Sequence, residues 1–69
     1  SPEEQLMVRR SLEQALRALD EREQRVIQMY YEFELSYKEI AAVLDLSDAR
    51  VCQLNKTALG KMKAMLQDA

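Results

Sequence analysis

The sequence contains no histidine and a single cysteine, and these two shortages exclude several kinds of functional site. One cysteine cannot form a disulfide within the chain. Without histidine, the common His/Cys metal sites and histidine-based acid–base or triad chemistry are unavailable. The carboxylates are scattered at spacings typical of solvated helix faces and not of a catalytic pair. We therefore predict that the chain is not an enzyme and that it binds no metal or cofactor.

Glycine and proline are equally scarce, with one residue of each among 69, while 48% of the residues are hydrophobic. This composition favours continuous helices with short connections, and no segment shows the alternation of a strand. No apolar run approaches the length of a bilayer span and no signal-peptide pattern is present, so nothing directs the chain to a membrane or out of the cell. We expect one all-α domain, residues 1–69, of marginal stability.

Charge is distributed unevenly along the chain. The formal net charge of −2 argues against strong autonomous DNA binding, because lysine and arginine supply most of the non-specific affinity for phosphates. Residues 1–35 carry five basic and eight acidic side chains, whereas residues 49–67 carry four basic side chains and no acidic one. This distribution indicates DNA contact through the last part of the chain and protein contact elsewhere.

Residues 36–54 contain two helix starts separated by a short turn. Ser36 and Glu39 make a capping-box pattern, and Ser47 provides a second cap. Asp45 falls where the first of these helices must end, in a left-handed conformation that aspartate tolerates better than most residues. The segment therefore has the pattern of two helices joined at a tight corner.

The first of these helices is expected at residues 37–44, followed by a turn at 45–47. The apolar residues have spacings that face inward when two short helices cross steeply, with a small residue at the crossing. They are Ile40, Ala41, Leu44, Leu46, Val51 and Leu54. Together they predict a helix-turn-helix over about residues 36–66, which points to DNA. A helical hairpin that does not bind DNA is the alternative.

Two further helices are predicted before this motif, which gives a small four-helix domain. The first spans residues 2–18 with Ser1 as its cap, and the second starts at the capping box of Asp20 and Glu23 and runs to about residue 32. Their inward positions are Val8, Leu12, Ala15, Leu16 and Leu19, then Val26, Ile27, Tyr30 and Tyr31, with Phe33, Leu35 and Tyr37 in a following aromatic corner. Interleaved glutamates would repel nucleic acid, so we interpret these aromatics as core and not as a base-stacking platform.

The final helix is predicted at residues 48–66 and is interrupted by Gly60, at a cost of about 1 kcal/mol relative to alanine. One face carries Val51, Leu54, Ala58, Met62 and Met65, and a second apolar edge carries Leu59, Met62 and Leu66. Packing against the first helix is the favoured interpretation of that edge. Docking of another protein is the alternative, because methionine-rich edges suit both.

Residues 19–27, 30–41 and 47–54 read Leu-Asp-Glu-Arg-Glu-Gln-Arg-Val-Ile, Tyr-Tyr-Glu-Phe-Glu-Leu-Ser-Tyr-Lys-Glu-Ile-Ala and Ser-Asp-Ala-Arg-Val-Cys-Gln-Leu. Through these segments the whole run from Leu16 to Leu66 resembles region 4 of a bacterial RNA polymerase sigma factor, most of all the flagellar and sporulation-type alternative sigma factors. The resemblance implies a transcription-initiation module in the bacterial cytoplasm that reads the −35 promoter element and binds the β flap of the polymerase core. It also implies an anti-sigma factor as a partner, and no membrane or small-molecule substrate.

The resemblance also assigns roles to residues by position. The DNA-binding residues expected from it are Ser47, Asp48, Ala49, Arg50, Cys52, Gln53, Lys56 and Lys61. Among them Gln53 and the first two helix residues would face base edges, and the basic residues would meet phosphates or the groove wall. The expected protein-docking residues are Leu6, Met7, Ile27, Tyr31, Leu59, Met62 and Leu66.

The start of the last helix departs from the flagellar pattern Glu-Ser-Arg-Val-Ser-Gln, since it reads Asp-Ala-Arg-Val-Cys-Gln. Ala49 offers only a methyl group for thymine, and Cys52 replaces a side chain that could bind phosphate. The alternative function is therefore a sigma-like protein-interaction module that binds an anti-sigma factor or the β flap with little DNA reading. Promoter recognition is favoured, because a mimic has no reason to keep basic and amide side chains on one helix face.

Overall fold

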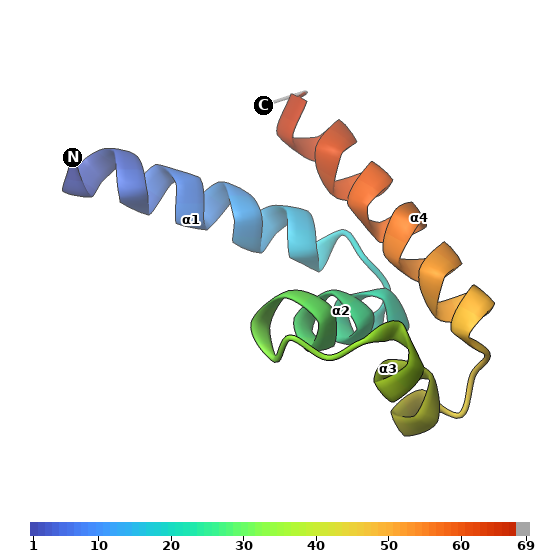
Figure 1. Cartoon of the computed structure of the whole chain (residues 1–69). Helices are drawn as coiled ribbons and strands as arrows, with labels where there is room; N and C mark the ends of the chain where they lie inside the picture. The colour runs from blue at the N-terminus through green and yellow to red at the C-terminus, as the bar shows by residue number, and fades with distance from the viewer. Residues whose placement is uncertain (68–69) are drawn as a thin grey trace.

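The computed structural model describes residues 1–67 of the chain, and these residues form an all-helical domain of 39 × 22 × 15 Å (Figure 1). The elements are α1 (Pro2–Arg17), α2 (Glu21–Ile27), the π-helical turn η1 (Gln28–Glu32), α3 (Tyr37–Leu44) and α4 (Asp48–Gln67). The predicted all-α, four-helix class is confirmed. None of the helices within residues 1–67 has both the length and the apolar character needed to cross a membrane.

Capping side chains start the helices where the sequence predicts. The Asp20 carboxylate accepts a hydrogen bond from the Glu23 amide at 2.8 Å, and Glu23 accepts one from the Asp20 amide at 3.0 Å. Ser36 and Glu39 make the same reciprocal pair at the start of α3, at 3.1 and 3.0 Å. These bonds satisfy amides that have no partner inside the helix, so the helix starts are encoded within a few residues.

The second helix ends near residue 32, as predicted, but its last part is a π-helical turn. The Phe33 amide donates to the Gln28 carbonyl at 3.2 Å, a bond to the fifth residue back in place of the fourth. The wider turn shifts the side chains that follow it around the helix axis. Tyr31 and Phe33 are therefore exposed, and the prediction that both lie in the buried aromatic corner is wrong.

Two clusters of buried side chains make up the core. The first joins α2, α3 and the first half of α4, and contains Val26, Ile40, Ala41, Val51 and Leu54, with Tyr30, Leu35, Tyr37, Leu44 and Leu46 packed against it. The second joins α1, α2 and the middle of α4, and contains Leu19, Ile27 and Ala58, with Leu16 and Met62 against it. The inward positions predicted for the helix-turn-helix are thus confirmed.

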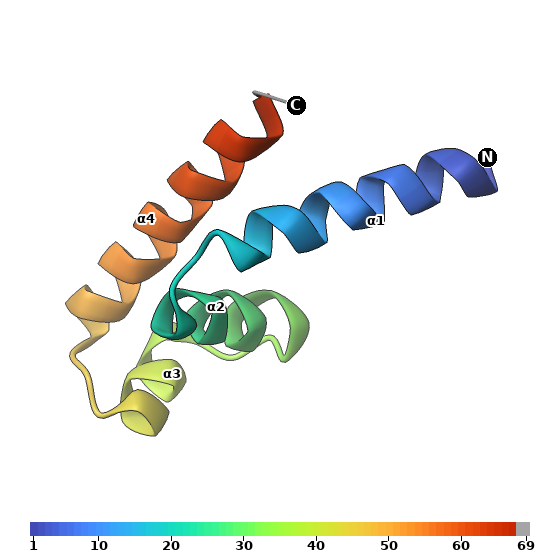
Figure 2. The same cartoon turned by 180° about the vertical axis from the view of Figure 1, so that it is seen from behind.

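The outer halves of α1 and α4 extend beyond this core and diverge from each other, as both views of the domain show (Figures 1 and 2). The predicted inward stripe of α1 is wrong at Val8 and Leu12, which are 59% and 41% exposed, because neither core cluster extends to these positions. Met65 is exposed for the same reason at the far end of α4. On the second edge of α4, Met62 packs against the second cluster, whereas Leu59 and Leu66 remain exposed.

Candidate nucleic-acid and protein interfaces

The corner between α3 and α4 is built by local hydrogen bonds. Asp45 has φ 56° and ψ 50°, the predicted left-handed conformation. The Leu46 amide then donates to the Ala41 carbonyl at 2.9 Å, and the Ser47 hydroxyl accepts from the Arg50 amide at 3.1 Å. The turn therefore places α4 against α3 in a fixed direction, which is the arrangement of a helix-turn-helix.

The first half of α4 presents a polar face to solvent. Its exposed residues are Ser47, Asp48, Ala49, Arg50, Gln53 and Lys56, and Cys52 is half-buried beside them. Within residues 1–67, neither Arg50 nor Lys56 takes part in an ion pair, so both charges remain available to a ligand. Residues three and four apart share a helix face, which brings Arg50, Gln53 and Lys56 together on one side.

Lys61, grouped with these residues by the sequence resemblance, has a partner inside the protein. Its ammonium nitrogen lies 2.9 Å from the Glu23 carboxylate, whose side chain is 2% exposed. The hydrogen bond with Glu23 raises the pKa of Lys61 above its ordinary value. The charge of Lys61 is thus already balanced, unlike that of Arg50 or Lys56.

A second polar contact inside the core was missed by the sequence analysis. Asn55 is buried, and its amide nitrogen donates to the Tyr37 hydroxyl at 2.9 Å, while its amide oxygen has no partner within the described chain. Tyr37 in turn packs on the Tyr30 ring, with centroids 4.9 Å apart. The only hint in the sequence is that Asn55 directly follows an inward leucine, next to the apolar stripe of α4.

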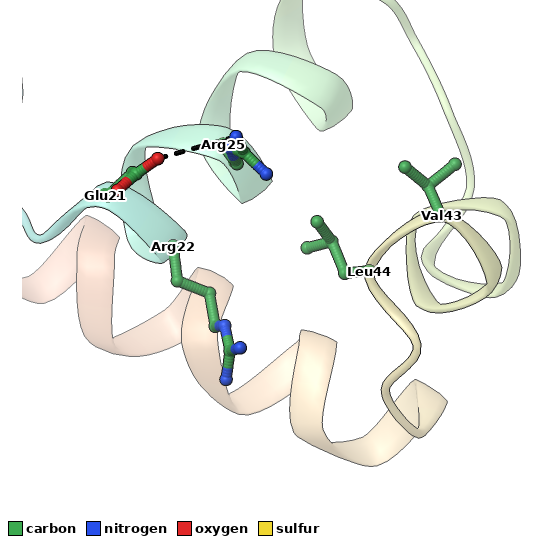
Figure 3. Close-up of a pocket in the computed structure, with 5 residues that line it drawn as sticks. All are labelled: Glu21, Arg22, Arg25, Val43 and Leu44. Atoms are coloured by element: carbon green, nitrogen blue, oxygen red, sulfur yellow. Dashed lines mark ion pairs between the residues drawn. The ribbon is translucent and has the colours of Figure 1, made fainter.

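Two arginines of α2 lie near the helix-turn-helix, at an open hollow of about 370 Å³ lined by Glu21, Arg22, Arg25, Val43 and Leu44 (Figure 3). Arg25 pairs with Glu21 at 3.4 Å, whereas Arg22 extends separately from the same helix and has no ion pair within residues 1–67. Arg22 lies between Glu21 and Glu23 in a segment that is acidic as a whole, so the sequence does not mark it as a DNA contact. Its nearness to the end of α3 is set by tertiary packing.

The predicted protein-docking residues lie in three separate regions. Ile27 is buried and Tyr31 exposed at a second hollow of about 320 Å³, lined by Leu16, Gln24, Ile27, Gln28, Tyr31 and Glu32. Leu6 and Met7 are exposed on the outer half of α1. Leu59, Met62 and Leu66 lie on α4, with Met62 half-buried.

At the hollow that Tyr31 lines, hydrogen bonds connect α2 to the end of α1. The side-chain amide of Gln24 donates to the Leu16 carbonyl at 2.9 Å and to the Leu19 carbonyl at 3.1 Å. The Leu16 carbonyl also accepts from the Leu19 amide at 3.1 Å, so the Gln24 side chain adds a second bond there and joins α2 to the end of α1. This contact was not predicted from the sequence.

Comparison of the sequence with known proteins identifies its family. The sequence model described as "Sigma-70, region 4" matches residues 15–64. The chain is 44% identical over 86% of its length to an "RNA polymerase sigma factor for flagellar operon" of Vibrio parahaemolyticus. It is 41% identical over 88% of its length to the "RNA polymerase sigma factor FliA" of Yersinia enterocolitica, and 38% identical over 96% to that of Escherichia coli K12.

The chain spans only about a quarter of the length of these curated relatives, namely 24%, 26% and 29% of the three proteins. No solved structure gave a significant match.

Proposed function

Because the chain belongs to the sigma-70 region 4 family, we propose that it recognises the −35 element of bacterial promoters with α4, as part of a flagellar-type sigma factor. Membership confirms the resemblance inferred from the sequence. It also agrees with the prediction that the chain is not an enzyme, since sigma factors act in transcription initiation without catalysing a reaction of their own. The proposed place of action is the bacterial cytoplasm.

The observation that carries the proposal is the polar face on the first half of α4, which begins directly after the left-handed turn. Its cations are not used within the described chain, and the opposite face of the helix is fixed in the core. In the proposed complex Gln53, Asp48 and Ala49 face base edges in the major groove. Arg50 and Lys56 contact phosphates, Ser47 contacts the backbone, and Cys52 lies at the groove wall.

Arg22 is added to the proposed DNA contacts, and Lys61 is left out of them. Arg22 lines the same hollow as Val43 and Leu44 of α3 and has no ion pair within residues 1–67, so it can neutralise a phosphate next to the groove that α4 enters. The ammonium of Lys61 already pairs with Glu23. Contact through only these few cations gives weak binding that falls steeply with salt, so most of the affinity must come from a protein partner.

That partner is proposed to be the RNA polymerase core, through the β flap. The hollow bordered by Leu16, Ile27 and Tyr31 offers an apolar surface for an inserted side chain, and Gln24 keeps its two walls together. Insertion of an apolar group into a preformed hollow is favourable because it removes apolar surface from water without reorganising the protein. An anti-sigma factor that covers the exposed apolar residues is proposed as a further partner.

A protein-interaction module with little DNA reading is the second candidate function. It is favoured by the exposed apolar side chains on the diverging halves of α1 and α4, above all Leu6, Met7 and Leu66. Large apolar side chains exposed on these two helix ends could each contact a partner protein. This candidate predicts that changes on the first half of α4 leave the function of the chain intact.

The test is selection from duplex DNA randomised over the −35 region, at low and then moderate salt. The Arg50→Ala/Gln53→Ala double variant is compared with Lys63→Ala/Gln67→Ala, which removes the same two kinds of side chain from the other end of α4. Promoter reading requires one enriched motif that the first variant loses and the second keeps. Binding without a motif, or equal effects of both variants, would contradict it and favour protein docking.

A further inference from the structure

Lys61 and Glu23 form an ion pair between elements that are far apart in the sequence. The ammonium nitrogen of Lys61 lies 2.9 Å from Oε1 of Glu23. Lys61 is 48% exposed, whereas the carboxylate side chain is 2% exposed and lies beneath α4. A buried carboxylate that lost this partner would keep an unbalanced charge away from water, so the contact is strongly favoured once the fold has formed.

The same carboxylate oxygen also holds the start of α2. Oε1 of Glu23 accepts a hydrogen bond from the Asp20 amide at 3.0 Å, and the Asp20 carboxylate accepts one from the Glu23 amide at 2.8 Å. The capping box and the ion pair therefore share one atom. Through it, Lys61 is attached to the rigid corner that joins α1 to α2.

This attachment is one of several along α4. Val51 and Leu54 anchor the helix in the first core cluster, and Ala58 anchors it in the second. At a rise of about 1.5 Å per residue, Lys61 lies roughly 15 Å along the helix from Val51. Apolar packing at these anchors is non-directional, whereas the ion pair joins two defined atoms, so the contact at Lys61 adds a specific constraint on the direction of α4.

We propose that Lys61 is a positioning residue, which through its ion pair with Glu23 fixes the direction in which α4 enters the major groove. This inference rests on the proposed DNA-reading function and deepens it. The side chain acts through the helix and not by touching DNA.

The positioning role and a phosphate contact have different consequences for binding. A two-point hydrogen bond to a base edge requires a defined direction, whereas a phosphate contact tolerates tilting of the helix. Loss of the ion pair should therefore reduce the preference for the correct site more than it reduces non-specific binding. The salt dependence should stay the same, because each phosphate contact contributes about 0.9 to the slope and Lys61 makes none.

The test compares the 69-residue chain with Lys61→Met, Lys61→Arg and the control Lys63→Met, at a temperature where circular dichroism shows each to be folded. Residual dipolar couplings measured by NMR report the direction of α4 relative to α2 without DNA. Titrations with the selected duplex and a scrambled duplex, at several salt concentrations, report preference and slope. Glu23→Gln, which keeps the shape and the bond to the Asp20 amide but removes the charge, replaces Lys61→Met if that variant does not fold.

The proposal expects Lys61→Met to change the direction of α4 and to lower the preference for the selected duplex by about tenfold, roughly the discrimination of one base contact, without changing the salt slope. Lys61→Arg and Lys63→Met should behave like the parent chain. Unchanged dipolar couplings, or a slope that falls by about 0.9, would overturn the positioning role in favour of a phosphate contact or of no role. If the parent chain prefers no duplex, the promoter-reading proposal fails, and the dipolar couplings still decide whether the ion pair directs α4.

Discussion

Two buried polar side chains, Glu23 and Asn55, each find a partner far along the chain. Glu23 pairs with Lys61, and Asn55 donates to the Tyr37 hydroxyl. A buried carboxylate without a partner would cost several kcal/mol. A buried amide without a partner would cost about 1–3 kcal/mol. Both contacts join α4 to another helix. These polar contacts therefore help to specify the position of α4 relative to α2 and α3 on an otherwise apolar core.

Because the pKa values of two capping carboxylates are lowered in the folded protein, we expect the protein to lose stability in acid. The hydrogen bond from the Glu23 amide holds the pKa of Asp20 below its ordinary value, and that from the Ser36 amide does the same for Glu39. Because the folded pKa is the lower one, the contribution of each group is present above the unfolded pKa of about 4 and is lost as the pH falls through the folded value. The free energy of unfolding should therefore decrease from about pH 5 downward.

Urea unfolding at a series of pH values, followed by circular dichroism, measures this loss. Asp20→Asn keeps an oxygen that can cap α2 but cannot titrate, so its unfolding free energy should decrease less in acid than that of the parent chain. Glu13→Gln, on an exposed face outside the capping boxes, serves as the control. The interpretation fails if Asp20→Asn and the parent chain lose stability in parallel.

Gly60 predicts a stabilising substitution. A Cβ atom added at this position meets no other atom within 4 Å, so alanine fits without displacing a neighbour. Glycine inside a helix costs about 0.5–1 kcal/mol relative to alanine because it loses more backbone freedom on folding. Gly60→Ala should raise the free energy of unfolding by about that amount in urea titrations. A decrease would show that α4 needs a flexible residue at this point.

At the scale of elements, the helices differ in how much of their length is held by the core. The second half of α1 contributes Ala15 and Leu16, and the corner after it contributes Leu19, whereas its first half buries no side chain. An isolated helix of this length is marginal in water, because helix stability in proteins comes mostly from packing. The helical order of residues 2–11 therefore depends on the half that is anchored.

This difference should be visible in amide hydrogen exchange measured by NMR. We expect amides in the first half of α1 to exchange much faster than those of residues 51–58 in α4, which lie between the two core clusters. Leu12→Ala should leave the global unfolding free energy nearly unchanged compared with Leu54→Ala, since a buried leucine costs about 2–5 kcal/mol to truncate. Equal protection along α1 and α4 would contradict this assignment.

At the scale of the whole molecule, the domain combines a net charge of −2 with a locally basic helix. The acidic remainder repels DNA, so the only surfaces suited to phosphates are those where cations have no internal partner. Among the described residues several cations have no ion pair, and of these Arg50 and Lys56 lie on the polar face of α4 and Arg22 lines the hollow beside Val43 and Leu44. The proposed complex is therefore weak by itself and depends on attachment to a larger protein, which raises the effective concentration of α4 at the promoter.

Salt titration of DNA binding tests this distribution of charge. Lys56→Ala should weaken binding to all duplexes alike and reduce the slope of log affinity against log salt by about 0.9, as expected for one lost phosphate contact. Gln53→Ala should instead change the preferred sequence with little effect on the slope. A Lys56→Ala variant with the parent slope would show that this side chain does not contact DNA.

The sequence by itself determined the helix starts, the left-handed turn at Asp45 and the inward positions of the helix-turn-helix. These features could be predicted because capping side chains act on amides three residues away, and because the period of the apolar pattern fixes which side of a helix is buried. The family could be identified for the same reason, since its characteristic segments are continuous in the chain. The candidate DNA-reading face followed from these local features.

Only the tertiary structure decided where the core ends and which charges are free. The helix α1 has an apolar stripe like that of a buried helix, yet Val8 and Leu12 are exposed because neither core cluster extends to them. Lys61 looks like a DNA contact in the sequence, but its partner Glu23 lies 38 positions away. Such pairings depend on how distant helices pack, and local patterns carry no information about that packing.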